Sequence, residues 1–297
     1  MSIQPVSFRL YAQDFDGFAR ALGESFERYG FAVVSDHGLD SALVAAADAG
    51  AKAFFALPEP VKRRYLIAGG AGQRGYTPFG IETAKGETHA DLKEFWHTGR
   101  AGNVWPEEIA GFRGAVGGLY DAFDGLGQKL LAAIASRLGL PREHFTDAVA
   151  DGESILRLLH YPPTTKPGAA IRAGAHEDIN AITLLLGAEE AGLELLDRDG
   201  RWLAVNPAPG SLVVNIGDML QRLTNHRLPS TTHRVVNPAP DRAGVARYSM
   251  PFFLHFAPNY LIETLPGCVA AETPDRYPQP ITARAYLAER LAEINLA

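Results

Sequence analysis

Apolar side chains in the first part of the chain recur with the spacing of helices. Asp14 suits a helix N-cap and Gly30 suits the end of the same helix. Between them, one face would carry Phe15, Phe18, Leu22 and Phe26. The run 31–34 predicts a short buried strand, and 40–56 predicts a second helix.

A glycine-rich stretch and a long helix complete the N-terminal half. Residues 69–86 predict a loop-rich crossing segment, which is either a plain loop or a lid. From Phe112, apolar side chains at three- and four-residue intervals predict one long helix, which Gly139 ends.

From Ser154 onward the pattern changes to short strands separated by turn residues. The predicted strands are 154–160, 179–186, 193–196, 201–205, 211–215, 232–236 and 247–256. Asp199-Gly200 predicts a hairpin, and 282–295 predicts a final amphipathic helix. We therefore expect a mostly β protein with flanking helices, whose strands form a sandwich or jelly roll after a helical N-terminal region, packed as one body.

Composition narrows the classes of function. The chain has 297 residues, 46% of them hydrophobic, with a net charge of -6 and one cysteine, Cys268. These values favour neither nucleic acid nor an anionic membrane as a partner, and we expect no transmembrane helix and no signal peptide. A single cysteine allows no internal disulfide and no thiolate metal cluster, so histidines and carboxylates must bind any metal. The default location is the cytoplasm.

His176 and Asp178 form a candidate metal site just before a predicted strand. In an extended chain, residues two apart point to the same face, so both can reach one ion while Glu177 points away. His233, in another strand-like run, is the preferred third ligand. Two histidines and one carboxylate leave positions open on a metal, which suits iron(II) oxygenases, whereas a structural zinc site is closed by four ligands.

Other interpretations of these residues are open. A His-x-Asp pair is common and often only makes hydrogen bonds near a turn. His226 is the rival third ligand, but its surroundings suggest a loop, which favours a supporting or surface position. A zinc hydrolase would lack an evident general base other than Glu177.

A candidate anion-binding pair follows downstream. Arg247 and Ser249 share one face of a predicted strand. A guanidinium beside a hydroxyl can bind a carboxylate through charge-assisted, bidentate hydrogen bonds.

The order of these motifs resembles the isopenicillin N synthase-like branch of the iron(II)/2-oxoglutarate-dependent dioxygenases. The resemblance covers nearly the whole chain in order. Besides the residues above, it rests on Tyr29-Gly30-Phe31-Ala32-Val33-Val34 with His37-Gly38, Asp91-x-Lys93-Glu94-x-Trp96, Asn103-x-Trp105-Pro106, Leu156-Arg157-x-x-x-Tyr161-Pro162-Pro163, Ala175-His176-Glu177-Asp178-x-x-x-Ile182-Thr183-Leu184-Leu185 and Asn215-x-Gly217-Asp218.

This resemblance implies a double-stranded β-helix (jelly-roll) core with the metal inside one mouth. By it, His176, Asp178 and His233 bind iron(II), Arg247 and Ser249 bind the distal carboxylate of 2-oxoglutarate, and Tyr161 adds a hydrogen bond. Dioxygen is the oxidant. Oxidative decarboxylation to succinate and carbon dioxide would be coupled to oxidation of a substrate C–H bond. Residues 1–150 would form the helix-rich N-terminal region, 151–260 the catalytic core and 261–297 a C-terminal extension with a helix.

Two departures leave the co-substrate pocket less defined. Leu159 stands where many members carry asparagine, and Asn225-His226 replaces the usual Asn-Gly. The Arg-x-Ser pair could instead hold the substrate's own carboxylate, as in oxidases of the same fold that need no 2-oxoglutarate, or serve an ascorbate-dependent oxidase. A catalytically silent binding module is a third possibility, which the intact set of site residues argues against.

The substrate is the least defined part of the prediction. We expect a small molecule, and hydroxylation rather than desaturation, ring closure or ethylene formation. Arg172 either faces an acidic substrate group or is a solvated loop charge. Four side chains either line the mouth or pack in the core, with core packing favoured: Tyr76, Phe79, Phe95 and His255.

Overall fold

The computed structural model describes residues 3–68, 72–81, 91–163, 171–186, 192–238 and 244–293. Parts of the glycine-rich segment 69–86, considered as either a loop or a lid, and the end of the final helix lie outside these ranges. The helices are α1 (Leu10–Gln13), α2 (Phe15–Tyr29), α3 (Ser41–Phe55), α4 (Glu59–Lys62), α5 (Phe112–Arg137), α6 (Thr146–Ala150), α7 (Asp218–Leu223) and α8 (Ala283–Glu293), with 3-10 turns at Arg63–Tyr65 and Pro266–Cys268.

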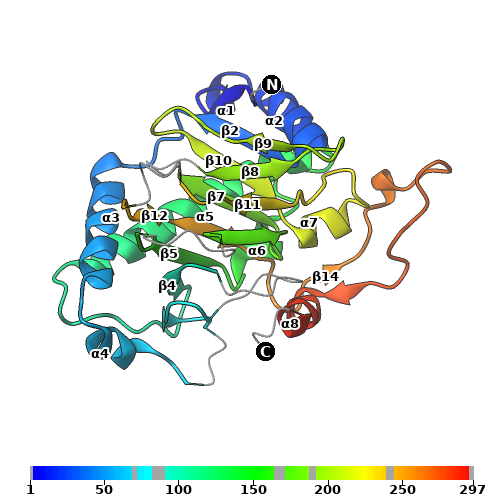
Figure 1. Ribbon diagram of the computed structural model, residues 1–297. Coiled ribbons are helices and arrows are strands. Elements are labelled where there is room, and N and C mark those ends of the chain that lie inside the picture. Colours follow the sequence, from blue (N-terminus) through cyan, green and yellow to red (C-terminus); the bar gives the residue numbers. More distant parts are fainter. Residues whose placement is uncertain are drawn as a thin grey trace.

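Strands form the centre of the molecule (Figure 1). They are β1 (Pro5–Ser7), β2 (Phe31–Ser35), β3 (Gly75–Thr77), β4 (Glu94–Gly99), β5 (Ile155–Tyr161), β6 (Ala173–His176), β7 (Ile182–Leu186), β8 (Leu193–Leu196), β9 (Trp202–Ala204), β10 (Leu212–Ile216), β11 (His233–Val235), β12 (Arg247–Ser249), β13 (Pro251–Leu254), β14 (Leu261–Ile262) and β15 (Ile281–Thr282).

Within the described residues, a main sheet and a smaller sheet make up the core. The main sheet has the order β1-β2-β10-β7-β13-β5-β4-β3, with β12 also paired to β5, and the smaller one has the order β6-β11-β8-β9. Apolar side chains from both sheets form one cluster between them: Phe31, Ala173, Leu193, Leu195, Val205, Val213 and Val235. Two sheets packed in this way make the expected jelly-roll core.

Helices cover the outer face of the main sheet. Because side chains alternate along a strand, Leu184, Phe252 and Leu254 point outward into a second apolar cluster, which also contains side chains of α2, α3 and α5. The ring of Phe123 on α5 stacks on Phe252, with ring centroids 5.7 Å apart. The inward positions carry the apolar cluster between the sheets and also two buried polar side chains, Thr183 on β7 and Asn215 on β10.

The N-terminal pattern folds as expected. Asp14 accepts a hydrogen bond from the Gly17 amide and caps α2, and Asp40 does the same for α3 through Ala42. Gly30 ends α2 with a φ of 66°, and a Cβ there would lie 2.4 Å from the Pro229 carbonyl oxygen. Glycine is therefore required for both the turn and the close approach.

The strands differ from the sequence prediction in several places. Six strands were not predicted: β1, β3, β4, β6, β14 and β15. Of these, β3 lies within residues 69–86, which were expected to form a loop-rich crossing segment. The strand expected at 179–186 starts only at Ile182, because the carbonyls of Asp178 and Asn180 accept hydrogen bonds from the start of α7 instead. The strand expected at 247–256 divides before Pro251, which has no N–H to donate to the ladder.

The C-terminal part packs against the core and also forms an ion pair with it. Ile262 and Ala283 belong to the outer apolar cluster, and Arg290 of α8, which is 25% exposed, lies 3.2 Å from the buried Asp218, the first residue of α7. Burial raises the pKa of Asp218 to about 6, against the influence of Ser230 and Arg290. The described residues contain no single helix long and apolar enough to cross a membrane; the bent pair 41–55 and 59–65 passes such a test only by length and composition.

Candidate active site

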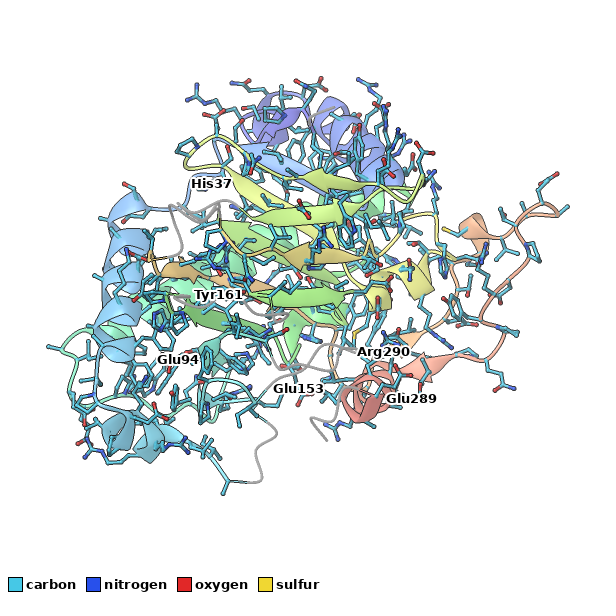
Figure 2. The ribbon with its side chains drawn as sticks, viewed as in Figure 1. His37, Glu94, Glu153, Tyr161, Glu289 and Arg290 are labelled. Atoms are coloured by element: carbon cyan, nitrogen blue, oxygen red, sulfur yellow. The ribbon has the colours of Figure 1, made fainter. Side chains whose placement is uncertain are left out.

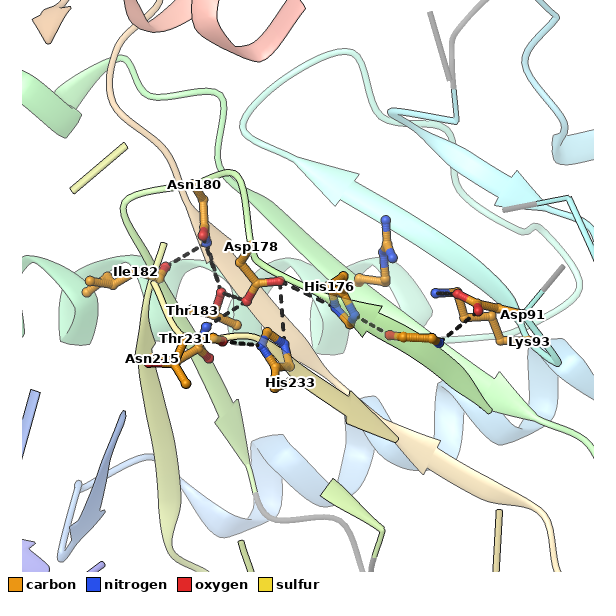
Figure 3. Close-up of polar contacts among 12 residues, drawn as sticks. Asp91, Lys93, His176, Asp178, Asn180, Ile182, Thr183, Asn215, Thr231 and His233 are labelled. Carbon is orange, nitrogen blue, oxygen red and sulfur yellow. Dashed lines mark hydrogen bonds and ion pairs between the residues drawn. The ribbon is translucent and has the colours of Figure 1, made fainter. Parts of the chain in front are cut away.

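Three predicted ligand side chains meet at one point (Figure 3). His176 ends β6, Asp178 lies in the loop that follows, and His233 begins β11 directly opposite His176. Each histidine Nε2 lies 3.8 Å from Oδ1 of Asp178, and the three donor atoms are all within 4.8 Å of one another. In the described part of the chain, no other cluster of His, Cys, Asp or Glu has this spacing.

Backbone carbonyls orient both imidazole rings. Nδ1 of His176 donates to the Gly174 carbonyl at 2.7 Å, and Nδ1 of His233 donates to the Thr231 carbonyl at 3.1 Å. With the proton on Nδ1, each Nε2 presents a lone pair toward Asp178. The His176 side chain is 35% exposed, but desolvation inside the barrel, and then the neighbouring His233, still lower its pKa to about 4, so the ring is neutral near pH 7.

Asp178 has one oxygen engaged and one directed to the histidines. Oδ2 accepts hydrogen bonds from Thr183 Oγ1 at 2.6 Å and Asn215 Nδ2 at 2.8 Å, while Oδ1 faces the two Nε2 atoms. Burial raises the pKa of Asp178, but the two histidines and these hydrogen bonds outweigh it and lower the pKa overall. The carboxylate therefore remains ionised.

Thr183 and Asn215 lie opposite each other on β7 and β10, at inward positions. Their support of Asp178 was missed in the sequence, although both occur in quoted motifs. Each of the two is a polar residue in an otherwise apolar strand, and this pattern could have indicated a supporting role.

The donor set fits iron(II). Two imidazole nitrogens and one carboxylate oxygen converge, and the remaining polar atoms of these side chains are engaged elsewhere, so three protein ligands are presented rather than four. Glu177 points away, as expected, and accepts a hydrogen bond from Thr232. The rival ligand His226 lies 2.6 Å from the Tyr277 hydroxyl and is not in the cluster.

The predicted anion-binding residues lie together on neighbouring strands. Arg247 and Ser249 are buried on β12, where Nη1 of Arg247 donates to Ser249 Oγ at 3.1 Å. Arg247 is paired across the sheet with Tyr161 of β5, and its Cζ lies 5.2 Å from the Tyr161 ring centroid. Tyr161 occupies the middle of the molecule (Figure 2).

Comparisons with known proteins agree with this geometry. Residues 152–256 match the model of the 2OG-Fe(II) oxygenase superfamily, and residues 4–108 match the N-terminal model of the non-haem dioxygenases in morphine synthesis. A 2-oxoglutarate-Fe(II) type oxidoreductase of Emericella nidulans, hxnY, is 34% identical over 90% of this chain and 83% of its own length. The chain belongs to the iron(II)- and 2-oxoglutarate-dependent oxygenases.

Solved structures support the same assignment. A 2OG-Fe(II) oxygenase family protein from Caulobacter crescentus is 61% identical with a TM-score of 0.92, covering 98% of this chain and 99% of that one. A full-length Neurospora crassa protein, solved with alpha-ketoglutarate (2-oxoglutarate), is 29% identical with a TM-score of 0.89, covering 98% and 95%. This oxygenase therefore uses iron(II), 2-oxoglutarate and dioxygen. The comparisons favour that activity over the oxidase and the silent binding module.

A second buried arginine of the oxygenase lies near Tyr161. Arg172 is only 1% exposed, so the prediction of a solvated loop charge is wrong. Its Nη2 donates to the Val245 carbonyl at 3.1 Å, and its Cζ lies 6.0 Å from the Tyr161 ring centroid. The guanidinium carbons of Arg172 and Arg247 thus lie 6.0 Å and 5.2 Å from the ring centroid of Tyr161.

The four side chains that were considered as lining the mouth of the barrel lie in different environments. Tyr76 belongs to the outer core and hydrogen-bonds to Glu94, as core packing predicts, whereas Phe79 is exposed. Phe95 packs with Leu159 and Tyr161 inside the barrel, so the apolar Leu159 is accommodated beside other apolar groups. His255 is buried at 7% exposure, as core packing predicts.

Proposed function

We propose that this oxygenase binds iron(II) through His176, Asp178 and His233, and binds the distal carboxylate of 2-oxoglutarate through Arg247 and Ser249. Tyr161 would add a hydrogen bond to that carboxylate. The observation that carries the proposal is the convergence of two Nε2 atoms and one Oδ1 atom within 4.8 Å, with the other polar atoms of the three side chains already engaged.

Each proposed residue contributes binding, orientation or charge. The ionised Asp178 would offset part of the charge of the metal, and the Nε2 atoms of His176 and His233 would complete one face of its coordination. Bound iron(II) supplies the centre at which dioxygen is activated. Arg247, with Ser249 beside it, would set the direction in which the co-substrate extends from the metal.

We further propose a small organic molecule as the primary substrate, with hydroxylation as the outcome. The names of the relatives support a small molecule: the Neurospora crassa protein has been solved with thymine, and other relatives are a proline hydroxylase and a flavanone 3-dioxygenase. A cytoplasmic location stays a prediction.

The test starts from metal-free protein under anaerobic conditions. Iron(II) should bind in a 1:1 ratio, and titration with 2-oxoglutarate should produce a saturable visible charge-transfer band. His176→Ala and Asp178→Ala should each abolish stoichiometric iron binding. Tight 1:1 iron in either variant would rule out the proposed ligands, and iron binding without any band would rule out co-substrate chelation at this metal.

A further inference from the structure

A buried ion pair lies between the N-terminal region and the proposed metal ligands. Asp91 and Lys93 are 5% and 7% exposed, and Lys93 Nζ donates to Asp91 Oδ2 at 2.7 Å. Both residues precede β4 and belong to the part of the chain that matches the N-terminal family model. Burial of two charges costs free energy, so the pair calls for a physical explanation.

The second oxygen of Asp91 contacts the strand that carries His176. Oδ1 accepts a hydrogen bond from the Gly174 amide at 3.0 Å, and the Leu92 amide donates to the Ile171 carbonyl at 3.3 Å. The carbonyl of Gly174 is the acceptor for Nδ1 of His176. Hydrogen bonds therefore link Lys93 to Asp91, Asp91 to the amide of Gly174, and the carbonyl of Gly174 to the imidazole of His176 (Figure 3).

His176 is the ligand whose orientation depends most on this path. Its side chain is 35% exposed, compared with 9% for His233 and 7% for Asp178. His233 also packs edge-on against the ring of Phe31, with centroids 5.5 Å apart. With less packing around His176, the Gly174 carbonyl must supply more of the restraint on its ring.

We propose that Asp91, paired with Lys93, is a positioning residue for the metal site. It fixes the amide of Gly174, so that the carbonyl of the same residue holds the imidazole of His176 with Nε2 toward the metal. The inference rests on the proposed function, because it takes His176 as an iron ligand. It adds that the N-terminal region contributes to metal binding without supplying a ligand.

A second buried lysine–carboxylate pair provides a matched control. Glu94 is 4% exposed and lies 2.7 Å from Lys62 Nζ. Its other partners are Tyr76 and His160, and none of these hydrogen bonds leads to a proposed metal ligand. Loss of Glu94 should therefore cost stability without changing the metal site.

The experiment compares Asp91→Ala, Asp91→Asn and Glu94→Gln in the full chain. Cobalt(II) serves as the spectroscopic probe of the site, and its affinity and visible spectrum are measured beside the unfolding temperature of the metal-free proteins. We expect Asp91→Ala to weaken cobalt(II) binding about ten-fold, in the lower part of the range for residues that support metal ligands. Asp91→Asn retains an acceptor for the Gly174 amide and should recover most of this loss. Glu94→Gln should bind cobalt(II) like the wild type.

A second measurement covers the case in which Asp91→Ala does not fold. In the cobalt(II) protein, the Nδ1 protons of ligand histidines have paramagnetically shifted NMR signals. An amide oxygen is a weaker acceptor than a carboxylate, so Asp91→Asn should still shift the signal of His176 by a small amount, and it should leave that of His233 in place.

Two results would overturn the positioning role. The first is that the Nδ1 signals of both histidines are unshifted in Asp91→Asn. The second is that Asp91→Ala and Glu94→Gln both lose cobalt(II) affinity in proportion to the stability that each variant has lost. Failure of the proposed function is separate, since His176→Ala would then bind cobalt(II) as tightly as the wild type.

Discussion

Replacement of Arg247 by methionine should separate co-substrate binding from metal binding. The side chain is 3% exposed and is held in place by its hydrogen bond to Ser249. A charge-assisted hydrogen bond contributes about 1.5–3 kcal/mol, so loss of a bidentate pair should cost about 3–4 kcal/mol once the remaining contacts of the ligand adjust. This corresponds to roughly a hundred- to a thousand-fold weaker binding of 2-oxoglutarate.

The assay is the anaerobic titration of the iron(II) protein, followed through the charge-transfer band. Pyruvate is a 2-oxo acid without the distal carboxylate, so its affinity should be the same in the wild type and in Arg247→Met. Arg247→Lys keeps the positive charge but loses the planar guanidinium. Its affinity for 2-oxoglutarate should therefore lie between those of the wild type and Arg247→Met. Arg137→Met is the control, because Arg137 pairs with Glu27 on the helical layer and should leave both affinities unchanged.

The reasoning would be refuted by either of two outcomes. If Arg247→Met weakened iron(II) and 2-oxoglutarate by the same factor, the residue would support the whole site rather than one carboxylate. If pyruvate binding fell as much as 2-oxoglutarate binding, the distal carboxylate would not be the group that Arg247 recognises.

Three further predictions follow from single contacts. Thr183→Val removes the 2.6 Å hydrogen bond to Asp178 and should weaken iron(II) binding about ten-fold or more; unchanged affinity in a metal titration would contradict this. Gly217→Ala would place a Cβ 2.2 Å from the Asn180 carbonyl oxygen, so urea unfolding should show a loss of about 1–3 kcal/mol, and wild-type stability would refute the close approach. Burial lowers the pKa of His255 to about 4, so the unfolded chain takes up a proton below about pH 6.5 that the folded chain does not. Between pH 6.5 and 5 the metal-free wild type should therefore lose about 2 kcal/mol more stability than metal-free His255→Phe, because the loss that His176 causes is common to both; equal pH slopes in the two proteins would argue against this.

Local pattern was sufficient for much of the fold. The cap at Asp14, the glycine end of α2, the helix predicted at 40–56 and the run of apolar residues in α5 depend on neighbours within a few residues, and the structure confirms them. The strand β4 was not predicted because it lies within a region that is mostly helical. It forms a strand because it pairs with β5. The division into 1–150, 151–260 and 261–297 stays a prediction.

The amino-acid sequence by itself determined which residues were available for metal and anion chemistry and the order in which they occur, and that order was enough to indicate the family. Only the tertiary structure decided how they are held. The pairing of β7 with β10 places Thr183 and Asn215 on one oxygen of Asp178, and the segment before β4 brings Asp91 to Gly174. These contacts join residues far apart in the chain, and their geometry depends on strand register and side-chain packing, which no local pattern encodes.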